Sequence, residues 1–365
     1  MGMSEPVDFC RKRMGHLRRL MEEREVEVLC LLRGARTGSL YKRLANTTSG
    51  QALLIPRDGH PCILCYPVNY ESTKDESWIR VREVEDREKI DEEIAEFINE
   101  HLRGGTQKIG INMDALTYKR YSYFKERLKG QLVDVSQTLL PEVFYGLYPE
   151  EVRFQREVSR LADIAIAAAR ESIAPGMREY EIAAEANYAM MRRGAEMQSF
   201  PTIVSSGERS AYCHGWPGDR TLKEGDLIIV DLGPMKQGYA ADETRTFLLG
   251  RDEKKEKMLA AVDRAVEAVL NSIKPGISCR DLDAISRRVL REEGFPDYPH
   301  SLGHPLSGLL VPILSKRSGD VLREGMVFTV EPGIYLPGYG GVRLEENVVV
   351  TEYGYEPLTK SPRLT

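Results

Sequence analysis

The chain has 365 residues, of which 42% are hydrophobic and 29% are charged, a composition that suits two globular domains with cores of their own. A net charge of −5 argues against nucleic acid or an anionic membrane surface as a partner. Because there is no apolar run near the roughly 18 residues of a membrane span, no signal-peptide core and only six scattered cysteines, we expect a cytoplasmic protein with reduced thiols.

Residues 1 to 147 predict an N-terminal α/β domain with a mixed sheet. Apolar periodicity and turn residues predict helices over 16–27, 89–102 and 118–129, strands over 26–32, 108–112 and 132–135, and a hairpin over 51–66 about Asp58 and Gly59. Cys62 and Cys65 fall in this hairpin. Residues three apart on a strand point to opposite faces, so we expect a structural pair rather than a metal or redox site.

Residues 148 to 365 predict a second domain that repeats itself at an offset of 100 residues. Residues 140–149 read as the connection, and Pro149 suits the first turn of the next helix. Matching positions include Asp163 and Asp263, Pro175-Gly176 and Pro275-Gly276, and Glu224-Gly225 and Glu324-Gly325. Each copy reads as helix, Pro-Gly turn, helix and antiparallel hairpin. We therefore expect two halves that face each other about a pseudo-two-fold axis, with a cleft between them.

Five residues of the second domain have the contexts of metal ligands: Asp231, Asp242, His304, Glu331 and Glu345. Four carboxylates with one neutral imidazole carry a charge of −4, which two divalent cations would cancel; without metal, converging buried carboxylates would repel one another. Any one acid alone is more often a helix cap, a turn former or a surface ion pair. However, Asp231 and Glu331 stand at the repeat offset, at equivalent strand ends, which chance does not explain.

The spacing of these five residues resembles the metal site of the pita-bread metallopeptidase superfamily, in its prolidase and aminopeptidase P branch. The segments at 200–207, 239–247 and 341–345 are similar to signatures of that branch, and residues 1–147 are similar to its creatinase-type N-terminal domain in size and α/β pattern. The resemblance implies an α/β (α+β) architecture with a C-terminal pita-bread domain at 148–365. It also implies two divalent metal ions, Mn, Co, Zn or Fe, with Asp231 and Asp242 on one, His304 on the other, and Glu331 and Glu345 on both.

The same resemblance implies roles for the neighbours of the ligands. Glu331 would pass a proton to the leaving amine, and His214 and His300 would hydrogen-bond the substrate or the tetrahedral oxyanion. Arg343 lies two residues before Glu345, so both point to one face of a strand, where Arg343 could brace a ligand carboxylate or bind substrate. The family is frequently dimeric, which implies a homodimer.

The sequence departs from the family pattern just after His304. The branch has a glycine next and a second substrate-binding histidine seven residues further on, whereas this chain has Pro305 and Val311. Our leading expectation is a metallo-dipeptidase or aminopeptidase that hydrolyses Xaa-Pro bonds in short proline-containing peptides. The departure keeps two alternatives open, a non-peptidase metal enzyme of the same fold that acts on a small amide-type substrate, and a non-catalytic binding protein.

Overall fold

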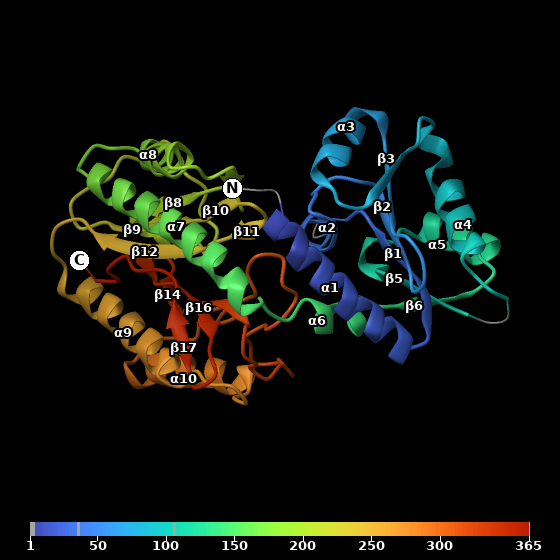
Figure 1. Ribbon diagram of the computed structural model, residues 1–365. Helices are drawn as coiled ribbons and strands as arrows, with labels where there is room; N and C mark the ends of the chain where they lie inside the picture. Colours follow the sequence, from blue (N-terminus) through green and yellow to red (C-terminus); the bar gives the residue numbers. More distant parts are fainter. Residues whose placement is uncertain (1–3, 35–36, 105–106, 365) are drawn as a thin grey trace. The chain divides into compact units, whose positions relative to one another are not determined.

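The computed structural model describes residues 4–34, 37–104 and 107–364. Its chain divides into two compact units, Met1–Phe144 and Tyr145–Thr365, and each is described by itself (Figure 1). Within the described residues, no helix combines the length and apolar character needed to cross a membrane.

The first unit is built on one six-stranded mixed sheet in the order β4-β3-β2-β1-β5-β6. Strands β1 and β2, and β2 and β3, pair antiparallel; β3 and β4, β1 and β5, and β5 and β6 pair parallel. The strands are β1 Val26–Leu32, β2 Ala52–Pro56, β3 Cys62–Cys65, β4 Arg80–Glu83, β5 Lys108–Ile111 and β6 Gln131–Asp134. The helices are α1 Ser4–Glu23, α2 Thr37–Ala45, α3 Pro67–Glu76, α4 Ile90–Glu100, α5 Tyr118–Arg127 and α6 Leu139–Val143.

The predicted mixed sheet and hairpin are confirmed, but four helices differ from the prediction. Helix α1 begins at Ser4, twelve residues before the predicted start, and ends at Glu23 rather than at residue 27, where strand β1 has already begun. Helix α3 begins on Pro67 and buries only Thr73, so it lacks the apolar stripe that a sequence pattern needs. Helix α6 overlaps the start of the segment 140–149 that was expected to be a connection, and its residues Leu139, Leu140 and Val143 are buried. Helix α2 was not predicted at all. Cys62 and Cys65 are free thiols, buried on strand β3.

The second unit contains the predicted duplication. Its first half holds α7 Val152–Ser172, α8 Glu179–Arg192, β7 Met197–Gln198, β8 Ile203–Ser206, β9 Leu227–Leu232, β10 Pro234–Lys236, β11 Tyr239–Ala240 and β12 Glu243–Leu248. Its second half holds α9 Glu253–Leu270, α10 Cys279–Glu292, β13 Val327–Val330, β14 Gly333–Leu336, β15 Gly340–Arg343, β16 Glu346–Val350 and β17 Tyr355–Pro357. Helices α7 and α8 therefore correspond to α9 and α10 at an offset of about 100 residues. Strands β9, β10, β11 and β12 correspond in the same order to β13, β14, β15 and β16. Figure 1 shows the helix pairs α7–α8 and α9–α10 on opposite sides of the strands.

The turns between the elements repeat as well. Gly176 and Gly276 both have φ +88°, and Gly225 and Gly325 have φ +85° and +82°, a left-handed conformation that glycine adopts without steric cost. The bridge between Arg178 and Thr221 has its counterpart, at an offset of 100, between Ser278 and Val321. This agreement in backbone conformation explains why the sequence repeat keeps its glycines.

Each half packs its helices on its own apolar core, and the acidic residues sit where the strands leave that core. Strand β9 pairs antiparallel with β12, with Asp231 opposite Thr244, and β13 pairs antiparallel with β16, with Val330 opposite Glu346. Ile228 and Val230 face the first core, and Phe328 and Val330 face the second. The hairpins of the two halves thus present carboxylates at corresponding strand ends.

Candidate metal centre

One cavity of about 830 Å³ brings together all eight site residues that the sequence predicts. Both halves of the second unit contribute to it, so a cleft between the repeats is present as expected. Its lining consists of Phe200, Ile203, Cys213, His214, Trp216, Asp231, Asp242, His300, Ser301, His304, Glu331, Arg343 and Glu345.

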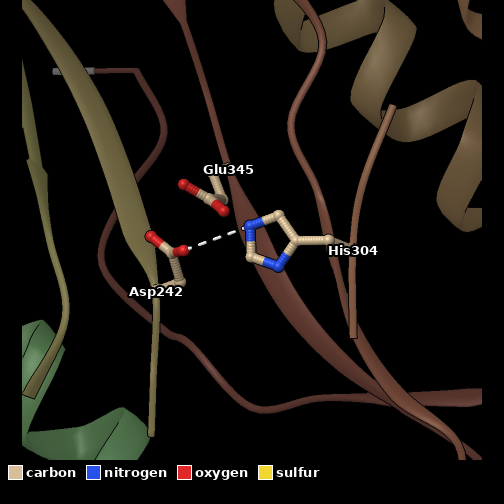
Figure 2. A group of neighbouring side chains, drawn as sticks. All are labelled: Asp242, His304 and Glu345. Atoms are coloured by element: carbon tan, nitrogen blue, oxygen red, sulfur yellow. Dashed lines mark ion pairs between the residues drawn. The ribbon is translucent and has the colours of Figure 1, made fainter. Parts of the chain in front are cut away.

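The tightest group in this cavity is formed by Asp242, His304 and Glu345. Each offers one ligand atom, and these atoms lie within 4.8 Å of one another. The Nε2 atom of His304 is 3.3 Å from Oδ2 of Asp242 and 3.5 Å from Oε1 of Glu331. Figure 2 shows the three side chains pointing toward a common centre from three separate segments of the chain. Such convergence is compatible with a cation site, because carboxylate and imidazole groups are common metal ligands.

Threonine hydroxyls orient two of the carboxylates. Thr244 donates from Oγ1 to Oε2 of Glu345 at 2.7 Å, and Thr329 donates to Oε1 of Glu331 at 3.1 Å. In contrast, Oδ1 of Asp231 and Oε1 of Glu345 are buried without a hydrogen-bond partner among the described residues. Buried carboxylate oxygens without donors are costly unless a cation satisfies them. The residues therefore fit divalent metal ions of the hard-to-borderline class that carboxylate and imidazole prefer.

The raised pKa values of the buried carboxyl groups favour the binding of a cation in the cavity. Burial, together with the charge of Asp231, raises the pKa of Asp242 to about 7 although His304 opposes the shift. Burial and the neighbouring carboxylates also raise the pKa of Glu345 well above its usual range, and burial raises that of Glu331. For His304, burial alone would lower the pKa, but the hydrogen bond with Asp242 and the charge of Glu331 outweigh it and raise the pKa to about 10. The raised pKa values of Asp242, Glu331 and Glu345 mean that burial and mutual repulsion disfavour their charged forms unless a cation offsets them.

Arg343 contacts the carboxylate of Asp231, a candidate ligand. Its guanidinium is buried and donates to Oδ2 of Asp231 at 2.6 Å and to Oγ1 of Thr244 at 3.2 Å. The same group donates to the hydroxyl oxygen of Tyr335 at 2.9 Å. The fork of the guanidinium therefore connects a candidate ligand to Tyr335.

His300 is neutral and already hydrogen-bonded at both ring nitrogens. Nδ1 lies 2.8 Å from the carbonyl oxygen of Ser301, which can only accept, so Nδ1 carries the proton. Nε2 then accepts from the hydroxyl of Tyr335 at 2.9 Å. Burial lowers the pKa of His300 to about 4, with the charge of Arg343 adding to the shift. The imidazole is thus held as a neutral partner of Tyr335 in this structure.

A buried glutamate positions the loop that carries His214. Oε1 of Glu179, at the start of α8, accepts from the backbone N–H and the hydroxyl of Ser206 at 2.8 Å each. Its Oε2 accepts from the N–H of Gly218 at 3.0 Å and from Arg209, which in turn donates to the carbonyl oxygen of Trp216 at 2.7 Å. The loop on either side of His214 is therefore anchored to the second helix of the first half.

The second helix of the other half anchors His300 in a similar way. Arg287 on α10 is buried and forms a bidentate ion pair with Asp283 at 2.7 and 3.1 Å. It donates to the carbonyl oxygens of Tyr298 and His300, both at 2.7 Å, and its guanidinium lies 3.8 Å from the ring centre of Tyr298. Each half thus uses a buried ionic contact to fix one of the two cleft histidines.

In the segment that departs from the family pattern, residues 305–311 are not among those that line the cavity, although His304 is. Val311 packs against the core of the second half. Ser307, three residues after His304, has φ +56°. Its hydroxyl makes buried hydrogen bonds with Gln155 and with the backbone of Ala240. The side chain at position 311 therefore contributes to packing in this structure.

The residues that hold the candidate ligands in place were not predicted from the sequence. Thr244 and Thr329 stand two residues from Asp242 and Glu331, a same-face spacing on a strand that could have identified them. Tyr335 follows Glu331 by four residues and has no distinguishing pattern. Glu179 and Arg287 look like ordinary surface charges of amphipathic helices, since only the fold reveals that they are buried.

A pH titration of stability tests the neutral state of His300. The folded pKa of about 4 lies below the ordinary value of 6.5, so between these values the unfolded chain binds more protons and acid favours unfolding. We expect the free energy of unfolding of the metal-free protein to rise with pH across this window more steeply than that of His300→Gln, which cannot titrate there. Denaturant unfolding at several pH values measures both slopes, and equal slopes would contradict the assignment.

Residues 153–352 match the model of metallopeptidase family M24, and residues 13–141 match that of the creatinase/prolidase N-terminal domain. An Xaa-Pro dipeptidase of Pyrococcus furiosus is 36% identical over 363 residues, covering 97% of this chain and 99% of the relative. The structure of an Xaa-Pro dipeptidase from Bacillus anthracis superimposes with a TM-score of 0.87 at 30% identity, over 98% of this chain and 100% of the other. That of an X-Pro aminopeptidase from Thermotoga maritima gives a TM-score of 0.88 at 27% identity, over 96% and 99%.

Proposed function

The chain belongs to metallopeptidase family M24, with a creatinase/prolidase N-terminal domain, and we propose that it hydrolyses Xaa-Pro bonds in short peptides. The observation that carries the proposal is the convergence of Asp242, His304 and Glu345, with Asp231 and Glu331, in one cleft between the two halves. Relatives named Xaa-Pro dipeptidase that match nearly the whole chain supply the substrate class.

We assign the metal site to the five predicted ligands. Asp231 and Asp242 would hold one divalent ion, His304 the other, and Glu331 and Glu345 both. Bound there, the ions would polarise the scissile carbonyl and supply a nucleophile at neutral pH. Oδ1 of Asp231 and Oε1 of Glu345 support this assignment, because they are buried without a hydrogen-bond donor and a cation would satisfy them.

The chain's own residues would bind the peptide and move the proton. Glu331 is oriented by Thr329, and its burial raises its pKa, so it is suited to accept a proton and to release it to the proline nitrogen as the bond breaks. His214 lies exposed in the cleft and would donate to the substrate carbonyl. We propose that His300 acts together with Tyr335, from whose hydroxyl it accepts a hydrogen bond. Arg343 would hold Asp231 in position.

The test is hydrolysis of a matched peptide panel by protein loaded in turn with Mn²⁺, Co²⁺ and Zn²⁺. We expect turnover of Xaa-Pro dipeptides or tripeptides and at least about a hundredfold lower kcat/KM for the Xaa-Ala analogues, a discrimination within reach of a shaped pocket. Released proline, measured by chromatography, reports the reaction. No turnover of any proline peptide by metal-loaded protein would overturn the proposal, and hydrolysis of small non-peptide amides instead would favour the alternative enzyme class.

The proposal extends to the metal, the assembly and the compartment. One imidazole with four carboxylates suits Mn, Co, Fe or Zn, and metal analysis of protein purified without chelators identifies which one is bound. We propose a homodimer, which light scattering on the full chain tests directly. A cytoplasmic location accords with the free cysteines in the described residues.

A further inference from the structure

A short segment after β17 contacts both halves of the second unit on the side opposite the cleft. This segment, residues 359–363, is called the strap here. Asp163 on α7 accepts from the backbone N–H groups of Lys360 and Ser361 at 2.6 and 2.8 Å. Arg363 donates from Nε to Asp263 on α9 at 2.6 Å. Asp163 and Asp263 are equivalent in the 100-residue repeat, so the strap is tied to the same position of each half.

The strap reaches the interior through Arg245, which is 1% exposed. The carbonyl oxygen of Ser361 accepts from its Nε at 3.2 Å and from a terminal nitrogen at 2.7 Å. The other terminal nitrogen donates to the carbonyl oxygens of Thr244 and Glu345, at 3.0 and 2.5 Å. Glu346 accepts a further bond at 3.0 Å, so all five N–H groups of this guanidinium are engaged.

Arg245 therefore connects the strap to the backbone of a candidate metal ligand. Side chains alternate along a strand, so Glu345 faces the cleft while Glu346 faces the strap. Thr359 reinforces this second face, because its hydroxyl donates to Glu346 and accepts from the N–H of Asn347 at 3.0 Å. Asn347 in turn exchanges hydrogen bonds with the backbone of Asp242, accepting from its N–H at 3.1 Å. Two ligands, one from each half, thus share supports on the face opposite the cleft.

We propose that the strap is a positioning element for the metal centre, acting through Arg245 on the backbone at Glu345 and through Asn347 on that at Asp242. Ligands held by strands of different halves keep their separation only if the halves are fixed to each other. Partners outside the ligand shell commonly contribute about 10–100-fold to metal affinity. The inference rests on the metal site proposed above and adds the residues that keep it in register.

Co²⁺ alone is the probe, because its ligand-field absorption reports coordination independently of activity. In the variant Asp163→Ala with Arg363→Ala, we expect the dissociation constant for Co²⁺ to rise about tenfold or more, with a changed absorption spectrum. Asp163→Asn keeps an oxygen that accepts from the strap and should retain most of the affinity. Arg264→Ala is the matched control, since it removes a bidentate pair with Glu293, at 2.8 and 2.7 Å, that lies within the second half and does not join the halves.

Each outcome decides the question. A double variant that unfolds cooperatively and binds Co²⁺ with the wild-type constant and spectrum would overturn the inference. If the double variant fails to fold, the comparison of Asp163→Ala with Asp163→Asn carries the same test, and equal affinities there would overturn it as well. If the wild-type protein itself binds no Co²⁺, the metal centre fails rather than the role of the strap.

Discussion

Replacing Glu331 with glutamine is expected to lower kcat/KM on Xaa-Pro peptides by at least about a thousandfold, because one change removes a metal ligand and a proton acceptor. The substitution keeps the shape of the side chain but takes one charge from the carboxylates that would offset the ions. The contact of Nε2 of His304 with Oε1 of Glu331 at 3.5 Å shows how closely the two share the centre. Metal content, measured on the same samples, separates lost binding from lost proton transfer.

Glu356→Gln is a suitable control for this experiment. Glu356 is also a paired glutamate of the second unit, but its partner is Arg156 on the surface. Its replacement should leave turnover within about twofold, since exposed ion pairs contribute about 0–1 kcal/mol. A Glu331→Gln protein with full metal content and wild-type kcat would show that another group moves the proton. One with little metal and no turnover would place its effect on binding.

The repeat made the core of the site predictable from sequence. Asp231 and Glu331 stand at an offset of 100, and a duplicated fold places equivalent strand ends near one axis. The structure brings both into one cavity with Asp242, His304 and Glu345, as that reasoning requires. The glycine pairs of the turns also helped to identify the repeat, because Gly176 and Gly276 both have a left-handed backbone that glycine adopts without steric cost.

The supports of the site were not predictable in the same way. Glu179 and Arg287 are buried charges, and burial depends on tertiary contacts that no local pattern reports. The pairing of Tyr335 with His300 joins positions 35 residues apart through a hydroxyl that sequence cannot orient. Helix α3 was missed for a related reason, since it is almost wholly solvent-facing and lacks the apolar period used to recognise helices.

Removing the guanidinium of Arg343 is expected to destabilise the metal-free protein by about 3–5 kcal/mol, the cost of leaving a buried charge without its partner. Arg343 is 3% exposed and pairs with Asp231 at 2.6 Å, in a cavity that already crowds four carboxylates. With metal bound, the loss in Arg343→Ala should be smaller, because the cation takes over the neutralisation of Asp231. Denaturant unfolding with and without Mn²⁺ measures this difference.

The two tryptophans allow the effect to be located. Trp216 belongs to the second unit and Trp78 to the first, so Trp78→Phe makes Trp216 fluorescence a reporter of the unit that contains the site. In that background Arg343→Lys keeps the charge but not the fork that spans Asp231, Thr244 and Tyr335, and it should fall between wild type and alanine. A loss below about 1 kcal/mol without metal would be typical of an exposed pair. It would mean that the carboxylates tolerate one another without Arg343, and that metal binding rather than the arginine decides their arrangement.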